Sequence, residues 1–292
     1  MKLIALIAAR NEDWILGFSA RAALMWCDEI VILDHASTDR TLAIANQIWD
    51  DNADRVTVIQ EPDPEWREME HRQRMLEMAR QRGATHIAMV DADEVLTANL
   101  VPTIRETIEN MQSGVVLQLP WLCLANGIGQ VYSAGMWGEQ DVSVAFEDDP
   151  RLYWAAENDG YCFHHRQPRG RPMPAIRRFP LRDAGLLHFQ FANMRRLRAK
   201  QALYQMIEVT RWPSRKRPNE IAALYGRTVR EAETGGCNPV PLELWLGFGY
   251  ERFIADHLRI DAEPWQEAEC KRLWSEHGPE KFAGLNLFGV VG

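Results

Sequence analysis

The first 120 residues alternate short apolar runs with longer segments in which apolar residues recur at helical spacing. Runs of about four to eight apolar residues are typical of buried strands, and the longer periodic segments predict amphipathic helices. Strands this apolar, joined by helices of this length, predict a mostly parallel sheet with helices on both faces. The expected strands cover residues 2–9, 29–33, 55–60, 86–90 and 115–119, and the expected helices cover 13–26, 38–49, 65–82 and 100–112.

This alternation is lost after Pro120 and is replaced by helical patterns from Met194 onward. We therefore expect an α/β domain over residues 1–190 and a helical C-terminal extension over residues 191–292. The helices expected in the extension cover residues 194–210, 218–234, 242–258 and 264–277.

Polar residues follow each of the first four expected strands. In parallel sheets, ligands bind outside the carboxyl ends of the strands, so these residues predict a binding site at one edge of the sheet. Ordinary turn chemistry, which also favours Asp, Asn and Ser, is the alternative explanation. The polar residues are Arg10-Asn11-Glu12 after the first strand, Asp34 to Asp39 after the second, Glu61 after the third and Asp91 to Glu94 after the fourth.

The sequence Asp91-Ala92-Asp93-Glu94, called the acidic turn below, places three carboxylates directly after a buried strand. Carboxylates this close repel one another, so a positive group is expected among them. Mg²⁺ or Mn²⁺ accepts oxygen ligands from one or two carboxylates and completes its shell with water and phosphate oxygens. The acidic turn therefore predicts a divalent metal that holds a nucleoside diphosphate, with a merely solvent-exposed turn as the alternative.

Two further residues carry specific expectations. Asp34 is the last residue of a buried strand, and its carboxylate could accept a hydrogen bond from the imide N–H of uracil or thymine. Arg72 lies on the apolar face of its helix, where a charge needs a partner. That partner would be a diphosphate or the Asp91/Asp93 pair, unless Arg72 sits at the edge of the face and extends into solvent.

Charge and cysteine content narrow the function classes. Residues 151–218 carry 15 Lys and Arg against 4 Asp and Glu, net +11, which leaves −19 for the rest of a chain whose total is −8. The basic segment 195–217 could contact a diphosphate, a phosphorylated glycan or an anionic membrane surface, whereas the acidic total and the lack of a recognition motif exclude nucleic acid. Five scattered cysteines favour a reducing cytoplasm, and no apolar run is long enough to span a membrane.

Together these motifs resemble a family-2 glycosyltransferase with the GT-A fold. The matching residues are Ala8 to Glu12, Asp28 to Asp34 running into Ser37-Thr38-Asp39-Arg40-Thr41, and the acidic turn. The chain is most similar to the bacterial branch that includes lipopolysaccharide-core glucosyltransferases. The resemblance implies an enzyme that transfers a sugar, with inversion, from a nucleoside-diphosphate donor, favouring UDP, to a glycan or glycolipid. It also implies a cytoplasmic location, with peripheral contact to the inner membrane as a further expectation.

The resemblance assigns roles by matched position. Asp34 would hold the base, although His35 stands where the family often has a second Asp or Asn and leaves base selectivity open. Ala9 and Asn11 would line the nucleotide pocket, and Arg72 would lie near the diphosphate. Asp91 would contact the ribose or the metal, Asp93 would coordinate the metal, and His188 would complete the metal site. Glu61, at the end of the third strand, is also expected to bind the nucleotide.

The catalytic base is not fixed by any motif. Asp141 and Asp183 are the preferred candidates, and Glu94, Glu147 and Asp148 remain open. The missing base motif keeps a non-catalytic glycan- or nucleotide-binding protein as an alternative function. A nucleotidyltransferase is the second alternative, but it would usually carry a Gly-rich phosphate loop after the first strand.

Overall fold

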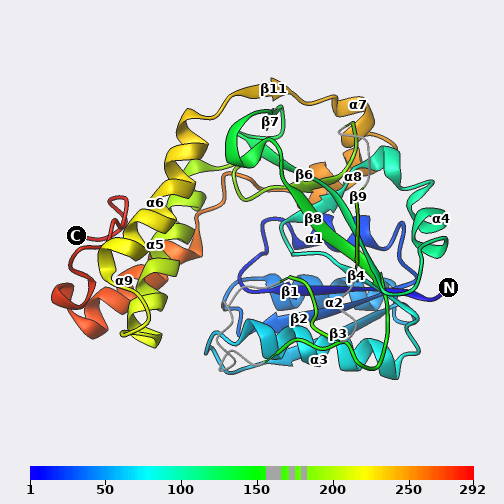
Figure 1. Ribbon diagram of the computed structural model, residues 1–292, viewed down its shortest axis with the longest axis horizontal. Coiled ribbons are helices and arrows are strands. Elements are labelled where there is room, and N and C mark those ends of the chain that lie inside the picture. The colour runs from blue at the N-terminus through cyan, green and yellow to red at the C-terminus, as the bar shows by residue number, and fades with distance from the viewer. Residues whose placement is uncertain (156–165, 171–174, 179–182) are drawn as a thin grey trace. The chain divides into compact units, whose positions relative to one another are not determined.

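The computed structural model describes residues 1–155, 166–170, 175–178 and 183–292 (Figure 1). The chain forms two compact units, and neither is a single continuous stretch. The expected division into domains 1–190 and 191–292 stays a prediction, because a compact unit need not be an independently folding domain. Unit 1 comprises Met1–Trp121, Gln140–Leu187 and Pro241–Arg259, and unit 2 comprises Leu122–Glu139, His188–Val240 and Ile260–Gly292.

The sheet of unit 1 is parallel in its first half and antiparallel in its second. The first four strands lie in the order β3-β2-β1-β4, all parallel. β8 is antiparallel to β4 and to β6, while β9 is parallel to β6, and β10 pairs with β5 and β6. The strands are β1 Leu3–Ala9, β2 Glu29–His35, β3 Val56–Glu61, β4 His86–Met89, β5 Glu94–Leu96, β6 Val115–Ala125, β8 Asp141–Glu147, β9 Ala175–Arg178 and β10 Leu186–His188.

Helices cover both faces of the parallel strands, because alternate strand residues point into two different cores. Leu3 and Ile7 of β1 pack in one core with residues of α1, α2 and α4, whereas Ile4 and Leu6 pack in the other with α3. Each of these side chains is almost fully buried, which contributes about 1.5–3 kcal/mol apiece. The predicted α/β class is confirmed: the sheet is parallel where helices connect the strands, and helices cover both faces. The helices are α1 Leu16–Ala23, α2 Thr41–Asp51, α3 Glu68–Gln81 and α4 Ile104–Glu109.

The helix expected over residues 242–258 is two short helices, and both belong to unit 1. α7 (Leu242–Trp245) and α8 (Tyr250–His257) are separated by Phe248 and Gly249, whose φ angles are +57° and +99°. An α-helix cannot continue through positive φ values. The buried Tyr250 hydroxyl donates to the Leu96 carbonyl at 2.9 Å, next to the 3₁₀ helix η1 (Ala98–Leu100), and ties α8 to unit 1.

Unit 2 is mainly helical, as expected for much of the C-terminal region. Ala202, Leu203 and Met206 of α5 pack with Cys270 and Leu273 of α9 in one apolar core. The end of β6 pairs with β7, and β7 pairs with β11, both antiparallel. The remaining elements are α5 Met194–Arg211, α6 Pro218–Thr234, α9 Trp265–His277, β7 Gln130–Tyr132, β11 Cys237–Pro239, and the 3₁₀ helices η2 Gly135–Trp137 and η4 Pro279–Phe282.

The basic face of α5 is largely balanced inside unit 2. Arg195 pairs with Glu267 and Arg198 with Glu233, each at 2.6 Å. The buried Arg196 donates to the Ala262 carbonyl at 2.8 Å. These contacts account for part of the positive charge in the segment 195–217, so its contact with a membrane or a phosphate stays a prediction. In the part of the chain that the structure describes, no helix has the length and apolarity to cross a bilayer.

Candidate functional site

The register of the parallel strands brings the predicted strand-end residues to one edge of the sheet. Ala9 of β1 lies beside Asp34 of β2, and the next residue, His35, lies beside Glu61 of β3. On the other side of β1, Leu6 pairs with Met89 of β4, so the acidic turn follows at the same edge. The gathering of polar residues that the sequence predicts is therefore present in the fold.

Asn11 links the loops that follow β1 and β2. Its side-chain oxygen accepts from the backbone N–H groups of Thr38 at 2.7 Å and Asp39 at 3.3 Å, and its own N–H donates to the Ser37 hydroxyl at 3.0 Å. Asn11 has a φ of +54°, a left-handed conformation that Asn adopts more readily than most residues. The sequence predicts that Asn11 lines the nucleotide pocket; in the structure its oxygen shapes the loops around that edge.

Asp34 combines burial with an open acceptor. The residue is 4% exposed, and its Oδ2 accepts from the Ser37 N–H at 3.4 Å. Its Oδ1 is buried without a hydrogen-bond partner among the described residues. Burial raises the pKa of this carboxyl, and its hydrogen bonds with Ser37 only partly oppose that rise. A buried acceptor without a partner is costly unless a ligand donates to it, which fits the predicted contact with a base.

A pair of buried histidines adjoins Asp34, and sequence reasoning missed it. The ring centroids of His35 and His71 lie 4.4 Å apart, and Trp66 contacts the His35 ring edge-on at 6.0 Å. Burial lowers the pKa of His35 to about 3 and that of His71 to about 4. Both rings are therefore neutral at physiological pH. The only signal was His35 itself, at a strand end where the family often carries an acid or an amide.

Glu61 has partners of its own. Its carboxylate accepts from Arg74 at 2.9 Å and from the Asp63 N–H at 3.1 Å. Its predicted contact with a nucleotide stays a prediction.

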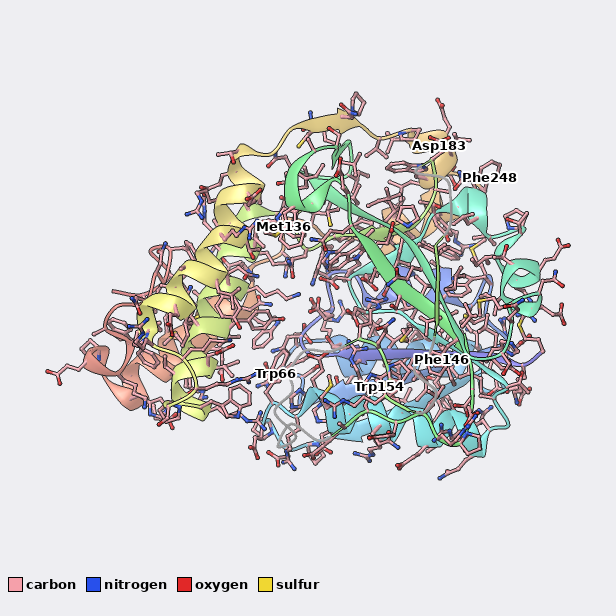
Figure 2. All side chains as sticks on the ribbon, in the orientation of Figure 1. Trp66, Met136, Phe146, Trp154, Asp183 and Phe248 are labelled. Carbon is pink, nitrogen blue, oxygen red and sulfur yellow. The ribbon has the colours of Figure 1, made fainter. Side chains whose placement is uncertain are left out.

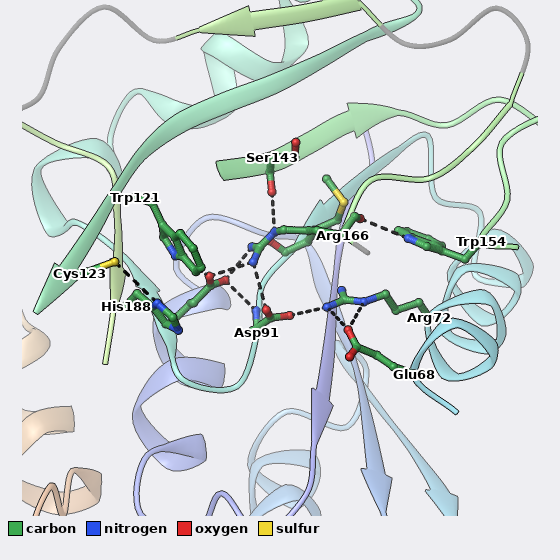
Figure 3. A network of polar contacts seen from close by, with 11 residues as sticks. Glu68, Arg72, Asp91, Trp121, Cys123, Ser143, Trp154, Arg166 and His188 are labelled. Atoms are coloured by element: carbon green, nitrogen blue, oxygen red, sulfur yellow. Dashed lines mark hydrogen bonds and ion pairs between the residues drawn. The ribbon is translucent and has the colours of Figure 1, made fainter. Parts of the chain in front are cut away.

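The acidic turn is held by two arginines (Figure 3). Arg72 donates to Asp91 Oδ1 at 2.9 Å and to Glu68 at 3.0 Å, so its expected partner on the acidic turn is Asp91. Burial alone would lower the pKa of Arg72, but Asp91 and Glu68 outweigh it and raise that pKa. This guanidinium stays charged and neutralises the acid that follows β4.

Arg166 is the second cation, and the sequence did not single it out for this role. It donates to Asp91 Oδ2 at 3.2 Å, to the two carboxylate oxygens of Glu94 at 2.8 and 2.6 Å, to the Met89 carbonyl at 2.6 Å and to the Ser143 carbonyl at 2.7 Å. A guanidinium has five N–H donors, so these contacts use all of them. Burial works against its charge, yet Glu94 and Asp91 raise the pKa of Arg166.

Glu94 is fully buried and completes the network. Besides Arg166, it accepts from the Trp121 indole N–H at 2.8 Å and from the Asp91 backbone N–H at 2.9 Å. These contacts occupy both of its oxygens, which makes it a poor candidate for a base that must reach an acceptor hydroxyl.

Asp91, Asp93 and His188 as metal ligands stay a prediction. Each oxygen of Asp91 already accepts from a guanidinium, and the positive charge of these two arginines would repel a metal ion bound to the same carboxylate. His188 belongs to unit 2, where its Nδ1 lies 3.9 Å from the Cys123 thiol. Within the described ranges, no three or more His, Cys, Asp or Glu side chains are grouped to hold a metal ion. Asp93, 7% exposed, keeps the right chemistry for one oxygen ligand.

The two preferred base candidates lie in different places. Asp141 begins β8 next to Gln140, whose carbonyl accepts from the N–H of Trp121, the residue bonded to Glu94. Asp183 is exposed, and its carbonyl accepts from Asn99 and Trp245. Figure 2 shows Asp183 far from Trp66, which packs on His35 at the strand ends. Asp141 thus lies in β8 and Asp183 in a turn before β10, and the role of either residue as the base stays a prediction.

The other two acidic candidates for the catalytic base, Asp148 and Glu147, have other partners or positions in the fold. Asp148 makes a two-point ion pair with Arg80 at 2.8 Å for each hydrogen bond. Glu147 ends β8 opposite His86, at the start of β4 and so at the end of that strand away from the acidic turn.

Residues 6–128 match the family described as "Glycosyl transferase family 2". No curated protein matches the sequence. Among solved structures, S. aureus TarS matches with 19% identity and a TM-score of 0.36, over 42% of this chain and 22% of that chain. A second structure, S. aureus TarS 1–349, matches with 11% identity and a TM-score of 0.43, over 97% of this chain and 82% of that one.

A third solved structure is GalNAc-T7 with UDP, GalNAc and Mn²⁺, at 16% identity and a TM-score of 0.31, over 43% of this chain and 23% of that chain. The matched region spans less than a quarter of the length of the longer TarS chain and of GalNAc-T7. Likenesses this distant assign no residue a role. The match to glycosyl transferase family 2 covers residues 6–128, the part of the chain that holds the strand ends and the acidic turn.

Proposed function

We propose that this protein is an inverting glycosyltransferase that moves a sugar from a nucleoside diphosphate to a hydroxyl group of a glycan or glycolipid. One observation carries the proposal: in the region that matches family 2, the buried Asp34 has a carboxylate oxygen without a hydrogen-bond partner among the described residues, at the same sheet edge as the acidic turn. An edge of this kind is where parallel sheets bind nucleotides.

The open oxygen of Asp34 favours a base that carries an imide N–H. Uracil and thymine have this donor at the ring position between two carbonyls, whereas cytosine does not. A UDP-sugar or a dTDP-sugar is therefore the proposed donor class, with UDP preferred. The neutral rings of His35 and His71 lie next to Asp34. They add no positive charge there that would attract a further phosphate group of the nucleotide.

Asp141 is proposed as the catalytic base. Its carboxylate would take the proton of the acceptor hydroxyl as the hydroxyl oxygen attacks the anomeric carbon of the donor. The bond from that carbon to the diphosphate oxygen breaks on the opposite face, so the nucleoside diphosphate leaves and the configuration inverts. Asp183, which is exposed, is the weaker candidate of the two.

Mn²⁺ or Mg²⁺ at Asp93 stays a prediction of the sequence. One carboxylate together with phosphate oxygens and water can fill the coordination shell of Mg²⁺, so the cation would arrive with the donor. Asp91 is not part of that set as the structure stands. The cytoplasmic location and the contact with the inner membrane likewise stay predictions.

Donor hydrolysis tests the proposed activity against a protein that only binds glycans or nucleotides. Purified protein is incubated with a panel of UDP-, dTDP-, GDP- and CDP-sugars, and released nucleoside diphosphate is measured. A transferase slowly releases the diphosphate of one donor class to water, and Asp141→Asn slows that release. Release from no donor would contradict the proposal, as would cleavage between the two phosphates, which yields a nucleoside monophosphate and a sugar 1-phosphate and is the chemistry of an enzyme that acts on the nucleotide phosphorus.

A further inference from the structure

The guanidinium of Arg166 bridges Asp91 and Glu94 of the acidic turn. It contacts Asp91 Oδ2 and both oxygens of Glu94 with N···O distances of 2.6–3.2 Å. We propose that Arg166 is a positioning residue that permanently fills the place between Asp91 and Glu94 and closes it to divalent cations. The inference rests on the proposed function only in taking the acidic turn as part of the donor site.

The position of Arg166 is fixed from several sides. Its Nε donates to Ser143 in β8, and its Nη2 donates to Met89 at the end of β4. These two carbonyls hold the guanidinium against the backbone of neighbouring strands, independently of the carboxylates. The side chain is 14% exposed and Glu94 is fully buried, so water does not screen the ion pair strongly.

Charge explains why the guanidinium and a cation exclude each other. A divalent ion bound between Asp91 and Glu94 would sit within a few ångströms of the Arg166 and Arg72 guanidiniums in a poorly hydrated place, where like charges repel strongly. Loss of Arg166 would instead leave two neighbouring carboxylates without their shared cation. Oxygen ligands of this kind attract Mn²⁺.

The two aspartates of the turn therefore have different roles. Asp91 and Glu94 are bound to arginine and shape the turn, and any metal that accompanies the donor would depend on Asp93. Asp91 resembles a metal ligand in sequence but acts as an ion-pair partner in the fold.

Binding of Mn²⁺ to the full-length protein without nucleotide tests the inference. The free Mn²⁺ signal in electron paramagnetic resonance counts the bound ions for the wild type, Arg166→Gln and Arg166→Lys. We expect the wild type and Arg166→Lys to bind no Mn²⁺ at the turn, and Arg166→Gln to bind about one Mn²⁺ ion per protein there. The gained site should be lost again in Arg166→Gln/Glu94→Gln.

Arg80→Gln is the matched control, because Arg80 also makes a two-point ion pair with one aspartate and donates to two backbone carbonyls in unit 1. Arg80→Gln leaves one carboxylate, that of Asp148, without its arginine, and not two neighbouring carboxylates. This variant should therefore gain no Mn²⁺ site. Mn²⁺ binding by the wild type that disappears in Asp91→Asn would overturn the inference, as would a folded Arg166→Gln that gains nothing. If Arg166→Gln does not fold, the comparison of the wild type with Asp91→Asn decides alone. Absence of nucleotide binding would overturn the proposed function and leave this result untouched.

Discussion

Arg72 in the middle of α3 places its Nη2 2.9 Å from the Oδ1 of Asp91, the first residue of the acidic turn. The guanidinium side chain is 5% exposed and also binds Glu68 one helical turn earlier. A charge on the apolar face of a helix is thereby matched by two carboxylates, and α3 is tied to the end of β4.

Arg72→Ala should destabilise the protein strongly. The substitution removes a buried cation from Glu68 and Asp91, although Asp91 keeps Arg166, and breaking a buried ion pair costs about 3–5 kcal/mol. The free energy of unfolding in urea measures the loss. Arg74→Ala is the matched control on the same helix, because Arg74 is 48% exposed and its pair with Glu61 is worth about 0–1 kcal/mol. Equal losses in the two variants would show that the Arg72 contacts do not support the fold.

Asp34→Asn should weaken nucleotide binding without lowering stability. A hydrogen bond to a charged acceptor contributes about 1.5–3 kcal/mol, so the dissociation constant should rise about tenfold to a hundredfold. Stability should not fall, because burial raises the pKa of this carboxyl and the folded state disfavours its charge. Calorimetric titration with the preferred nucleotide, beside urea unfolding, measures both. Asp39→Asn, an exposed change in the same loop, should leave the affinity nearly unchanged; an equal loss there would remove the special role of Asp34.

The histidine pair predicts a fall in stability towards acid pH. The pKa values of His35 and His71 are about 3 and about 4 in the folded protein and 6.5 for an ordinary imidazole. Between those values the unfolded chain binds protons that the folded chain does not. The stabilisation is therefore complete above pH 6.5 and declines as the pH falls, by about 2 kcal/mol per ring at pH 5.

Urea unfolding at pH 7 and pH 5 measures this decline. His35→Phe and His71→Phe should each reduce it, since the substituted ring no longer binds a proton in the unfolded chain. A pH dependence identical to that of the wild type in both variants would mean that other groups cause it.

Asp141→Asn should lower turnover about a hundredfold to ten-thousandfold while the nucleotide affinity stays unchanged. The reason is that the base acts on the acceptor hydroxyl and not on the donor. Steady-state transfer rates and calorimetry separate the two quantities. Asp183→Asn should change neither, and an effect on turnover confined to Asp183 would reverse the assignment.

Much of the first half of the fold could be predicted from the sequence, because its signals are local. Apolar runs fixed the parallel strands, and parallel pairing places their polar ends at one edge. The helices α1, α2 and α3 each begin three residues later than expected. Polar side chains of the preceding loops bind backbone N–H groups near the expected helix starts, as Asp39 does for the N–H of Thr41. The helices begin only after these loop contacts.

The parts that sequence reasoning missed depend on distant residues. Arg166 lies 75 positions from Asp91 in the sequence, and no local pattern around either residue predicts that they form an ion pair. The antiparallel strand β8 joins β4 and β6 through the same kind of long-range pairing, in a region without helix and strand alternation. A carboxylate motif indicates that a cation is needed, but only the fold shows that an arginine supplies it for Asp91.

Isothermal titration of the purified protein with UDP, GDP, CDP and dTDP shows whether the strand ends of the sheet bind a nucleotide. Each nucleotide is titrated with Mn²⁺ and with EDTA, into the wild type, Asp34→Asn and Asp93→Ala. We expect micromolar binding of UDP, or of dTDP, that Asp34→Asn weakens. Binding of none of the four nucleotides under either condition would contradict this expectation, because the strand ends would then not be a donor site.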